Sequence, residues 1–269
     1  MQHSILRSQG RSYNELRPIT ISYDHYGYAA ASVLFELGNT KVHCAVNLQP
    51  GVPPFLKGKR SGWLKAEYAM LPSATAVRTN REASSMERNG RSIEISRLIG
   101  RVLRSVVNLD LLGEQTIIID CDVLQADGGT RTACITGAFL ALSIAIERWI
   151  KAGKLSHTIL TDEIAAISIG VVHNQVLLDL DFVEDSSIDA DFNVVLTKSG
   201  SIIEIQGTAE KKPVPWHLFQ EIYTVAQQGI TQLFTACAGK HTQVALPPRT
   251  AILEKEQAPL FSLKNRLTK

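Results

Sequence analysis

Residues 116–124 read Thr-Ile-Ile-Ile-Asp-Cys-Asp-Val-Leu, residues 128–132 read Gly-Gly-Thr-Arg-Thr, and residues 133–146 read Ala-Cys-Ile-Thr-Gly-Ala-Phe-Leu-Ala-Leu-Ser-Ile-Ala-Ile. The first run is rich in β-branched residues and predicts a strand, and the last is apolar nearly all round and predicts a buried helix. Two glycines between them let the backbone turn sharply and approach a ligand closely. The N–H groups that begin the helix favour an anion, and Arg131 adds a planar fork of donors that suits phosphate oxygens. The alternative is an ordinary capped turn, with Thr130 as the N-cap and Arg131 facing water.

The composition is that of a globular protein with a sizeable core. The chain has 269 residues, of which 45% are hydrophobic and 20% are charged, which suits one large domain or two small ones. Its four cysteines are scattered without metal-ligand spacing, so buried reduced thiols in a cytoplasmic protein are the best account. The first ten residues lack the apolar core of a secretory signal. The most apolar run, residues 133–146, is too short for a membrane span.

Basic residues are concentrated in one part of the chain. Residues 51–110 hold eleven basic and five acidic residues, although the net charge of the whole chain is only +2. A local excess of this kind indicates a localised surface for a polyanion. The alternative is a solvated helix face, because Arg97, Arg101 and Arg104 recur at helical spacing.

The hydrophobic pattern predicts two successive rounds of strands followed by a helix. This arrangement favours an α+β fold, an internally duplicated domain of sheets packed on helices, over residues 1–239. Residues 240–269 lack periodicity and predict a weakly ordered tail. The expected strands are 19–24, 30–37, 41–47, 63–71, 115–124, 164–172, 175–182, 192–197 and 201–207, and the expected helices are 92–107, 132–151 and 215–237.

Residues 179–191 hold six carboxylates and no basic residue. Clustered carboxylates invite a hard cation such as Mg²⁺. Asp179 and Asp185 would share a face of a straight strand but lie ~20 Å apart at ~3.3 Å per residue, so they could share one metal only if the chain bends between them. The alternative is a solvated acidic loop.

Seven motifs, in one order from about Gly10 to about residue 237, together closely resemble those of the ribonuclease PH family. They are Glu15-Leu-Arg-Pro18, Gly38-Asn-Thr-Lys-Val42, Val52-Pro-Pro-Phe-Leu56, Asn89-Gly-Arg-Ser-Ile-Glu-Ile-Ser-Arg-Leu-Ile-Gly100, the run from Asp122 to Thr132, the segment from Asp179 to Asp185, and Glu204-Ile-Gln-Gly-Thr-Ala-Glu210.

The resemblance implies a phosphorolytic 3′-to-5′ exoribonuclease, also called a tRNA nucleotidyltransferase. Such an enzyme uses inorganic phosphate as co-substrate, releases nucleoside 5′-diphosphates, and can run in reverse. The family trims residues beyond the CCA end of tRNA precursors. The resemblance therefore implies that the partners are tRNA precursors and other RNA 3′ ends, and that the chain assembles as a cytoplasmic hexamer, a trimer of dimers, without a membrane.

The resemblance also assigns residue roles. Phosphate would be bound by Arg91, Gly129, Thr130 and Arg131. Asp179 and Asp185 would be the catalytic carboxylates and would hold Mg²⁺, although the sequence does not say which carboxyl is the general acid and which the metal ligand. Arg78 and Arg81 would contact RNA or a neighbouring subunit.

The chain departs from the family pattern at Ser73, where an arginine usually follows the proline of a Leu-Pro motif, and at Gln9, where Asp is common. Ser73 puts ring stability or tRNA affinity in doubt rather than the chemistry.

Two other functions compete with phosphorolysis. A hydrolytic metal-dependent nuclease would explain the acids but has no use for a phosphate pocket at Arg91 and Arg131. A catalytically silent RNA-binding ring subunit would explain the basic segment, but such subunits typically lose the arginines or aspartates that this chain keeps.

Overall fold

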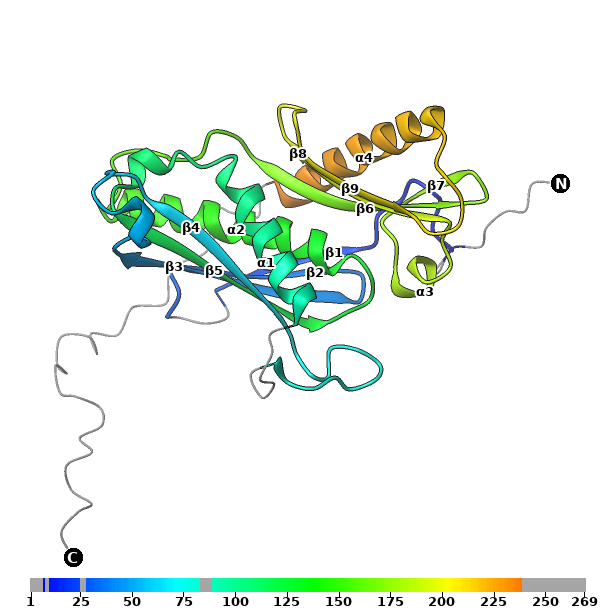
Figure 1. The fold of residues 1–269 in the computed structure, drawn as a ribbon, viewed down its shortest axis with the longest axis horizontal. Coiled ribbons are helices and arrows are strands. Elements are labelled where there is room, and N and C mark those ends of the chain that lie inside the picture. The colour runs from blue at the N-terminus through cyan, green and yellow to red at the C-terminus, as the bar shows by residue number, and fades with distance from the viewer. Residues whose placement is uncertain (1–6, 8–9, 25–27, 83–88, 239–269) are drawn as a thin grey trace, which may run out of the picture.

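The computed structural model describes Arg7 and residues 10–24, 28–82 and 89–238. Within these ranges the chain forms two β-sheets with helices packed on them (Figure 1). The expected α+β duplication is confirmed, because each sheet is followed in the chain by one long helix. The tail expected at residues 240–269 lies outside the described residues.

The first half of the chain forms a five-stranded sheet. Its elements are β1 (Ile19–Tyr23), β2 (Ala31–Leu37), β3 (Thr40–Pro50), η2 (Pro54–Leu56), β4 (Trp63–Met70), α1 (Gly90–Arg104), η4 (Leu109–Leu112) and β5 (Gln115–Gln125). The strand order is β1-β2-β3-β5-β4, and all neighbours are antiparallel except β4 and β5. Parallel neighbours need a crossover connection, and α1 provides it.

The second half forms a four-stranded antiparallel sheet in the order β7-β6-β8-β9. Its elements are β6 (Ile164–Val172), β7 (Gln175–Leu178), α3 (Phe182–Asp185), β8 (Ala190–Thr197), β9 (Ile202–Ala209) and α4 (Trp216–Cys237). Asn174 lies in the β6–β7 turn with a left-handed backbone, as its turn signal predicts. Helix α4 covers the face of this sheet that is turned away from the first sheet (Figure 1).

Helix α2 (Thr130–Lys151) lies between the two sheets and packs on strands of both (Figure 1). This position explains its all-round apolar sequence, since a helix that contacts protein on several sides has no polar face to present. By length and composition α2 could cross a membrane, but most of it is buried in the protein, which is the position of a core helix. All four cysteines are buried thiols, as expected.

Several expected boundaries differ from the structure, and two of them lie beside the site. Helix α1 begins at Gly90 rather than Ser92, because the Asn89 side chain caps it by accepting from the N–H of Arg91. The strand expected at 175–182 ends at Leu178 and gives way to the one-turn helix α3. A capping box starts that helix: the Asp181 side chain accepts from the Glu184 N–H and the Glu184 side chain from the Asp181 N–H.

Gly137 sets how closely α2 approaches the first sheet. A Cβ there would lie 3.1 Å from Cys44 Sγ and 3.2 Å from Phe35 Cβ, so a larger side chain would overpack the core. We expect Gly137→Val to lower the free energy of unfolding by about 1–3 kcal/mol, measured by denaturant titration. Ser143→Val is the matched control, because it places the same side chain on the same helix beside a cavity of about 230 Å³. Equal losses in the two variants would contradict the overpacking account.

Candidate active site

Helices α1 and α2 begin close together, beyond the carboxyl ends of the parallel strands β4 and β5. Tyr68 in β4 is linked to both helices: its N–H donates to Ser96 Oγ at 2.9 Å, and its hydroxyl lies 3.2 Å from Thr130 Oγ1. Burial raises the pKa of Tyr68 to about 12, although Arg91 and Arg131 act in the opposite direction. A neutral tyrosine thus marks the place where two helix N-termini and two arginines meet.

The turn before α2 contains two glycines in the left-handed region, with φ of 77° at Gly128 and 63° at Gly129. The expectation that Thr130 could be the N-cap is wrong, because Gly129 is the N-cap and Thr130 is the first helical residue. Gly129 has no side chain with which to cap the helix, which leaves the first N–H groups of α2 for an anion.

Gly128 brings this turn against the acidic segment. A Cβ at Gly128 would lie 2.5 Å from the carbonyl oxygen of Leu180 and 2.6 Å from the carbonyl carbon of Asp181. Only glycine fits such an approach of two backbones. The turn before α2 and the segment that leads into α3 are therefore in direct contact.

Arg131 contacts residues of α1 and β9 rather than facing only water. Its side chain is 20% exposed, its Nη1 donates to Gln206 Oε1 at 2.6 Å, and Glu94 Oε1 lies 3.5 Å away. Glu94 belongs to α1 and Gln206 to β9, so both halves of the chain contribute. Arg91, in the first turn of α1, is exposed.

Two carboxylates lie within electrostatic reach of these arginines. Burial, and then the negative charge of Asp191, raise the pKa of Asp185, while Arg91 and Arg131 act to lower it. The pKa of Asp191 in β8 is likewise raised by burial and by Glu210, against the effect of Arg131. Asp185 keeps solvent access at the end of α3. The structure therefore places Asp185 within electrostatic reach of both predicted phosphate-binding arginines.

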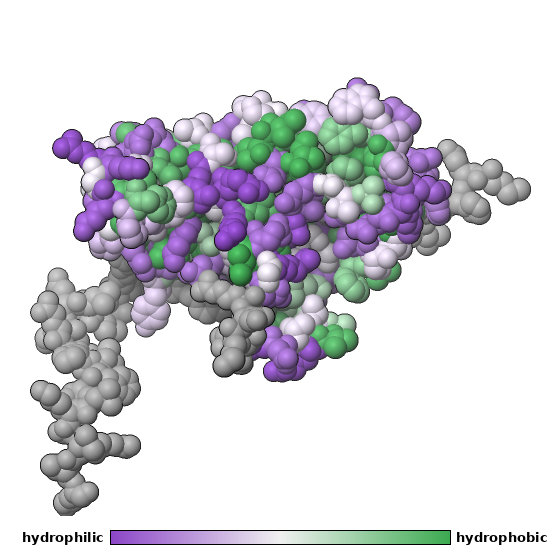
Figure 2. Space-filling model, viewed as in Figure 1, coloured by the Kyte–Doolittle hydropathy of each residue, from purple (hydrophilic) through white to green (hydrophobic). Residues whose placement is uncertain are grey.

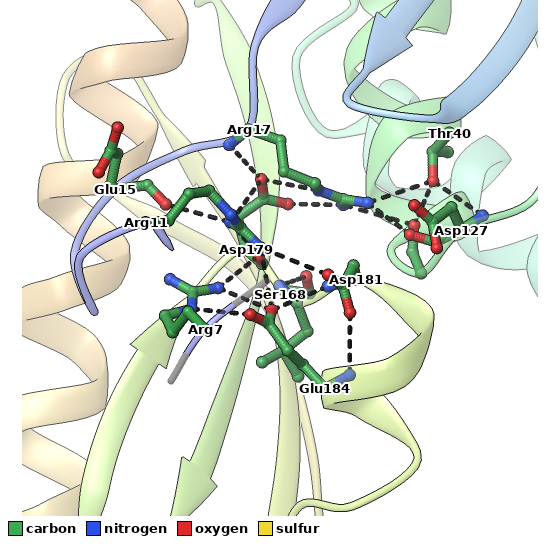
Figure 3. Close-up of polar contacts among 12 residues, drawn as sticks. Arg7, Arg11, Glu15, Arg17, Thr40, Asp127, Ser168, Asp179, Asp181 and Glu184 are labelled. Atoms are coloured by element: carbon green, nitrogen blue, oxygen red, sulfur yellow. Dashed lines mark hydrogen bonds and ion pairs between the residues drawn. The ribbon is translucent and has the colours of Figure 1, made fainter. Parts of the chain in front are cut away.

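Asp179 does not join Asp185 at this place. The chain does bend between them, as sharing a metal would require, but the Asp179 side chain is fully buried and points towards Arg17 (Figure 3). Its Oδ1 accepts from Arg17 Nη2 at 2.7 Å, and its Oδ2 accepts from the Arg17 N–H at 2.7 Å and from Nε at 3.0 Å. The structure does not place Asp179 beside Asp185, as the expectation that the two hold one Mg²⁺ requires, because an arginine already takes up both oxygens of Asp179.

Asp191 is the acid that sequence reasoning missed. It was counted within the acidic cluster, but no spacing rule shows that β8 returns beside α3 and places Asp191 near Asp185. Gln206 was quoted only as part of a motif. The sequence showed only that this motif follows a predicted turn. That position does not reveal the contact of Gln206 with Arg131.

The acids offer a site that fits a divalent cation. Among the described residues no group of three or more metal-ligating side chains comes together. Burial and then the negative charge of Asp191 raise the pKa of Asp185, and a cation beside the two carboxylates would offset their repulsion. Mg²⁺ is usually bound by one or two carboxylates together with substrate phosphates and waters.

The basic segment is only partly free to meet a polyanion. Hydrophilic side chains are prominent over β4 and α1 (Figure 2). Arg101 pairs with Glu204 at 2.8 Å, and Arg104 lies over the Trp63 ring at 4.5 Å, so part of the charge is used within the chain. Arg78 and Arg81 are exposed on the loop that follows β4, and their contact with RNA or another subunit stays a prediction.

Family models match most of the chain. The description "3' exoribonuclease family, domain 1" applies to residues 15–146, and "3' exoribonuclease family, domain 2" applies to residues 162–229. The chain is therefore a 3′ exoribonuclease, with one family domain in each half.

Curated relatives make the assignment more particular. Ribonuclease PH of Bacillus subtilis is 52% identical over 229 residues, which cover 85% of this chain and 94% of that protein. Ribonuclease PH of Neisseria meningitidis (strain FAM18) is 50% identical over 236 residues, or 88% and 96%. The chain belongs to the ribonuclease PH family and is a phosphate-dependent exoribonuclease of the nucleotidyltransferase type.

Solved structures share the fold. Rice (Oryza sativa) Rrp46 superposes with a TM-score of 0.71 at 17% identity, covering 87% of this chain and 100% of that one. A chain of an Archaeoglobus fulgidus exosome with RNA bound to the active site superposes with a TM-score of 0.72 at 22% identity, covering 86% and 92%.

The position of Arg131 predicts a phosphate-binding defect when it is shortened. We expect Arg131→Ala to raise the KM for phosphate and lower turnover, with a combined loss of about 1.5–3 kcal/mol for one charge-assisted contact. Arg131→Lys should restore activity only in part, because an ammonium cannot reproduce the planar fork. Arg101→Ala is the matched control, since that arginine pairs with Glu204 at the surface. Unchanged phosphate kinetics in Arg131→Ala would return Arg131 to the role of a surface residue.

Proposed function

We propose that this chain trims nucleotides beyond the CCA end of tRNA precursors and acts on other RNA 3′ ends. The observation that carries the proposal is the meeting of two helix N-termini, Arg91 and Arg131 beside Asp185. The likeness to proteins named Ribonuclease PH supports this substrate class. A neighbour of the same fold has RNA bound to its active site.

In the proposed reaction, inorganic phosphate is the nucleophile. Gly129, Thr130 and the N–H groups at the start of α2 would hold it together with Arg91 and Arg131, which offsets the repulsion between phosphate and the phosphodiester. A phosphate oxygen forms a bond to the terminal phosphorus of the RNA as the bond to the 3′-oxygen of the preceding nucleotide breaks. The 3′-oxygen takes up a proton, and a nucleoside 5′-diphosphate leaves.

Asp185 is the carboxylate that would serve the leaving group. Burial and the charge of Asp191 raise its pKa when no cation is bound, and a cation held between the two carboxylates would keep both of them ionised. We assign Mg²⁺ to Asp185 and Asp191, where it would neutralise charge on phosphate oxygens. In this proposal Asp179 has no direct part in the reaction.

The same features argue against a silent ring subunit. Such a subunit has no use for two arginines beside a helix N-terminus with a carboxylate within electrostatic reach of both. A hydrolytic nuclease would not need the anion site. We further propose that the chain works in the cytoplasm as a hexamer built from three dimers, as the family resemblance implies.

Phosphate dependence is the first expected outcome. Purified protein with Mg²⁺ and a 3′-extended tRNA should release nucleoside diphosphates only when phosphate is present, because phosphate supplies the attacking oxygen. The products are identified by ion-exchange chromatography. Asp185→Asn is the negative control, expected to keep RNA binding while losing turnover. Monophosphates released at the same rate without phosphate would show a hydrolytic enzyme.

Assembly should depend on position 73. Ser73 is exposed on the same loop as Arg78 and Arg81, where the family usually has a further arginine that offers more donors to a partner. We expect the ring to dissociate on dilution and in salt, with dimers appearing before monomers, and Ser73→Arg to shift the balance towards the ring or tighten tRNA binding. Sedimentation velocity across protein and salt concentrations measures this. A ring that persists at nanomolar protein in high salt would contradict the expectation.

A further inference from the structure

Arg17, in the motif Glu15-Leu-Arg-Pro18, is a cation that neither phosphate binding nor RNA binding uses. Its side chain is only 2% exposed although it lies near the active site. Each of the five N–H bonds of its guanidinium has an acceptor. The acceptors are Asp179 Oδ2 for Nε, Asp179 Oδ1 and the Gly128 carbonyl for Nη2, and the Asp127 carbonyl and Thr40 Oγ1 for Nη1.

These acceptors belong to two different segments. Asp127 and Gly128 form the turn that leads into the N-terminus of α2, and Asp179 begins the bend that leads into α3. One planar group therefore spans the junction between the phosphate-binding turn and the acid-bearing segment (Figure 3). The Thr40 hydroxyl also holds the turn before α2, since it donates to the Gly128 carbonyl at 2.6 Å.

On the side of the acid-bearing segment, the hydrogen-bond network extends to Glu184, the residue before Asp185. Arg7 donates to both oxygens of Glu184, at 3.0 and 2.8 Å, and Arg11 donates to Glu184 Oε2 at 3.0 Å. Both arginines also donate to the Asp179 carbonyl at 2.9 Å. Asp179 itself has a left-handed backbone, with φ of 56°, which is uncommon for a residue other than glycine.

We propose that Arg17 and Asp179 are positioning residues that set the separation between the phosphate-binding turn and Asp185. This inference rests on the proposed function, because that function makes the separation matter. An in-line displacement requires nucleophile, phosphorus and leaving oxygen to be aligned, and a misplacement of ~1 Å lowers the rate about 100-fold. The pair touches neither phosphate nor RNA and acts through the two segments that it joins.

Charge alone does not explain the contact. Three buried arginines (Arg7, Arg11 and Arg17) face three buried acids (Asp179, Asp181 and Glu184). Lysine at position 17 would keep this balance, but an ammonium has three donors without a planar fork and cannot reach acceptors on both sides of the junction. Arg17→Lys thus separates charge balance from bridging.

The test compares Arg17→Lys, Asp179→Asn and the double variant with Arg148→Lys. Arg148 forms the matched control pair, donating Nη1 to Asp24 Oδ1 at 2.8 Å and to the Ala30 carbonyl at 2.9 Å, away from the site. For each full-length protein we would measure kcat and KM for phosphate, the Kd of inorganic phosphate by calorimetry, and the melting temperature.

We expect Arg17→Lys and Asp179→Asn each to lower kcat by about 10- to 100-fold and to change the Kd of phosphate much less. The double variant should be no slower than the slower single variant, because both changes break one link. Arg148→Lys should lower the melting temperature but leave kcat unchanged.

Three results would overturn the inference. The first is a folded Arg17→Lys protein with wild-type kcat. The second is a loss of kcat in Arg148→Lys as large as in Arg17→Lys, which would indicate general loosening. The third is multiplied losses in the double variant, which would make Asp179 a catalytic residue in its own right. Failure of the wild type to release diphosphates would instead refute the proposed function.

If Arg17→Lys does not fold, Thr40→Val answers the same question. It removes the hydroxyl that donates to the Gly128 carbonyl and accepts from the Asp127 N–H and Arg17 Nη1, and it leaves the ion pair with Asp179 intact. The expected result is again a fall in kcat with little change in phosphate affinity, and wild-type kcat in a folded Thr40→Val protein would overturn the inference.

Discussion

The burial of α2 between two sheets is the constraint on which the arrangement of the protein depends. The two sheets face each other, and a single helix that is apolar nearly all round covers part of both. The N-terminus of that helix is therefore fixed relative to both halves of the chain. This helix therefore positions the turn at its own start, the loop that follows β4 and the turn into α3.

The charged groups of the site are arranged as in a binding site for charged ligands. Two arginines converge at the start of α2, and two carboxylates with raised pKa values lie within reach of them. Such groups are costly to bring together without partners, because burial penalises each charged form. An anion beside the arginines and a cation beside the acids would each lower that cost.

Much of the fold could be predicted from the sequence, because its signals are local. The β-branched run before Gly128 and the apolar run after it predicted β5 and α2, and the Gly38-Asn39 turn predicted the hairpin of β2 and β3. The parallel pairing of β4 with β5 could not be predicted, since it depends on a crossover over a distant helix. The extension of the strand through residue 182 was wrong because a capping box overrode the strand pattern.

The sequence predicted those site residues that lie within a recognisable motif. It did not predict those whose place depends on contacts between distant segments. Arg91, Thr130 and Arg131 come together as the resemblance implied. Spacing within residues 179–191 could not reveal that Asp179 turns towards Arg17, because Arg17 lies 162 residues earlier in the chain. It also could not show that Asp191 on β8 takes the neighbouring place at Asp185.

Gly128 has a consequence for how this protein can change over generations. Most tight spots in a core tolerate a larger residue once a neighbouring side chain shrinks, so that paired substitutions keep them open to variation. At position 128 the obstacle is the backbone at residues 180 and 181, which every amino acid carries alike. No second substitution can make room there, so this position is closed to sequence drift.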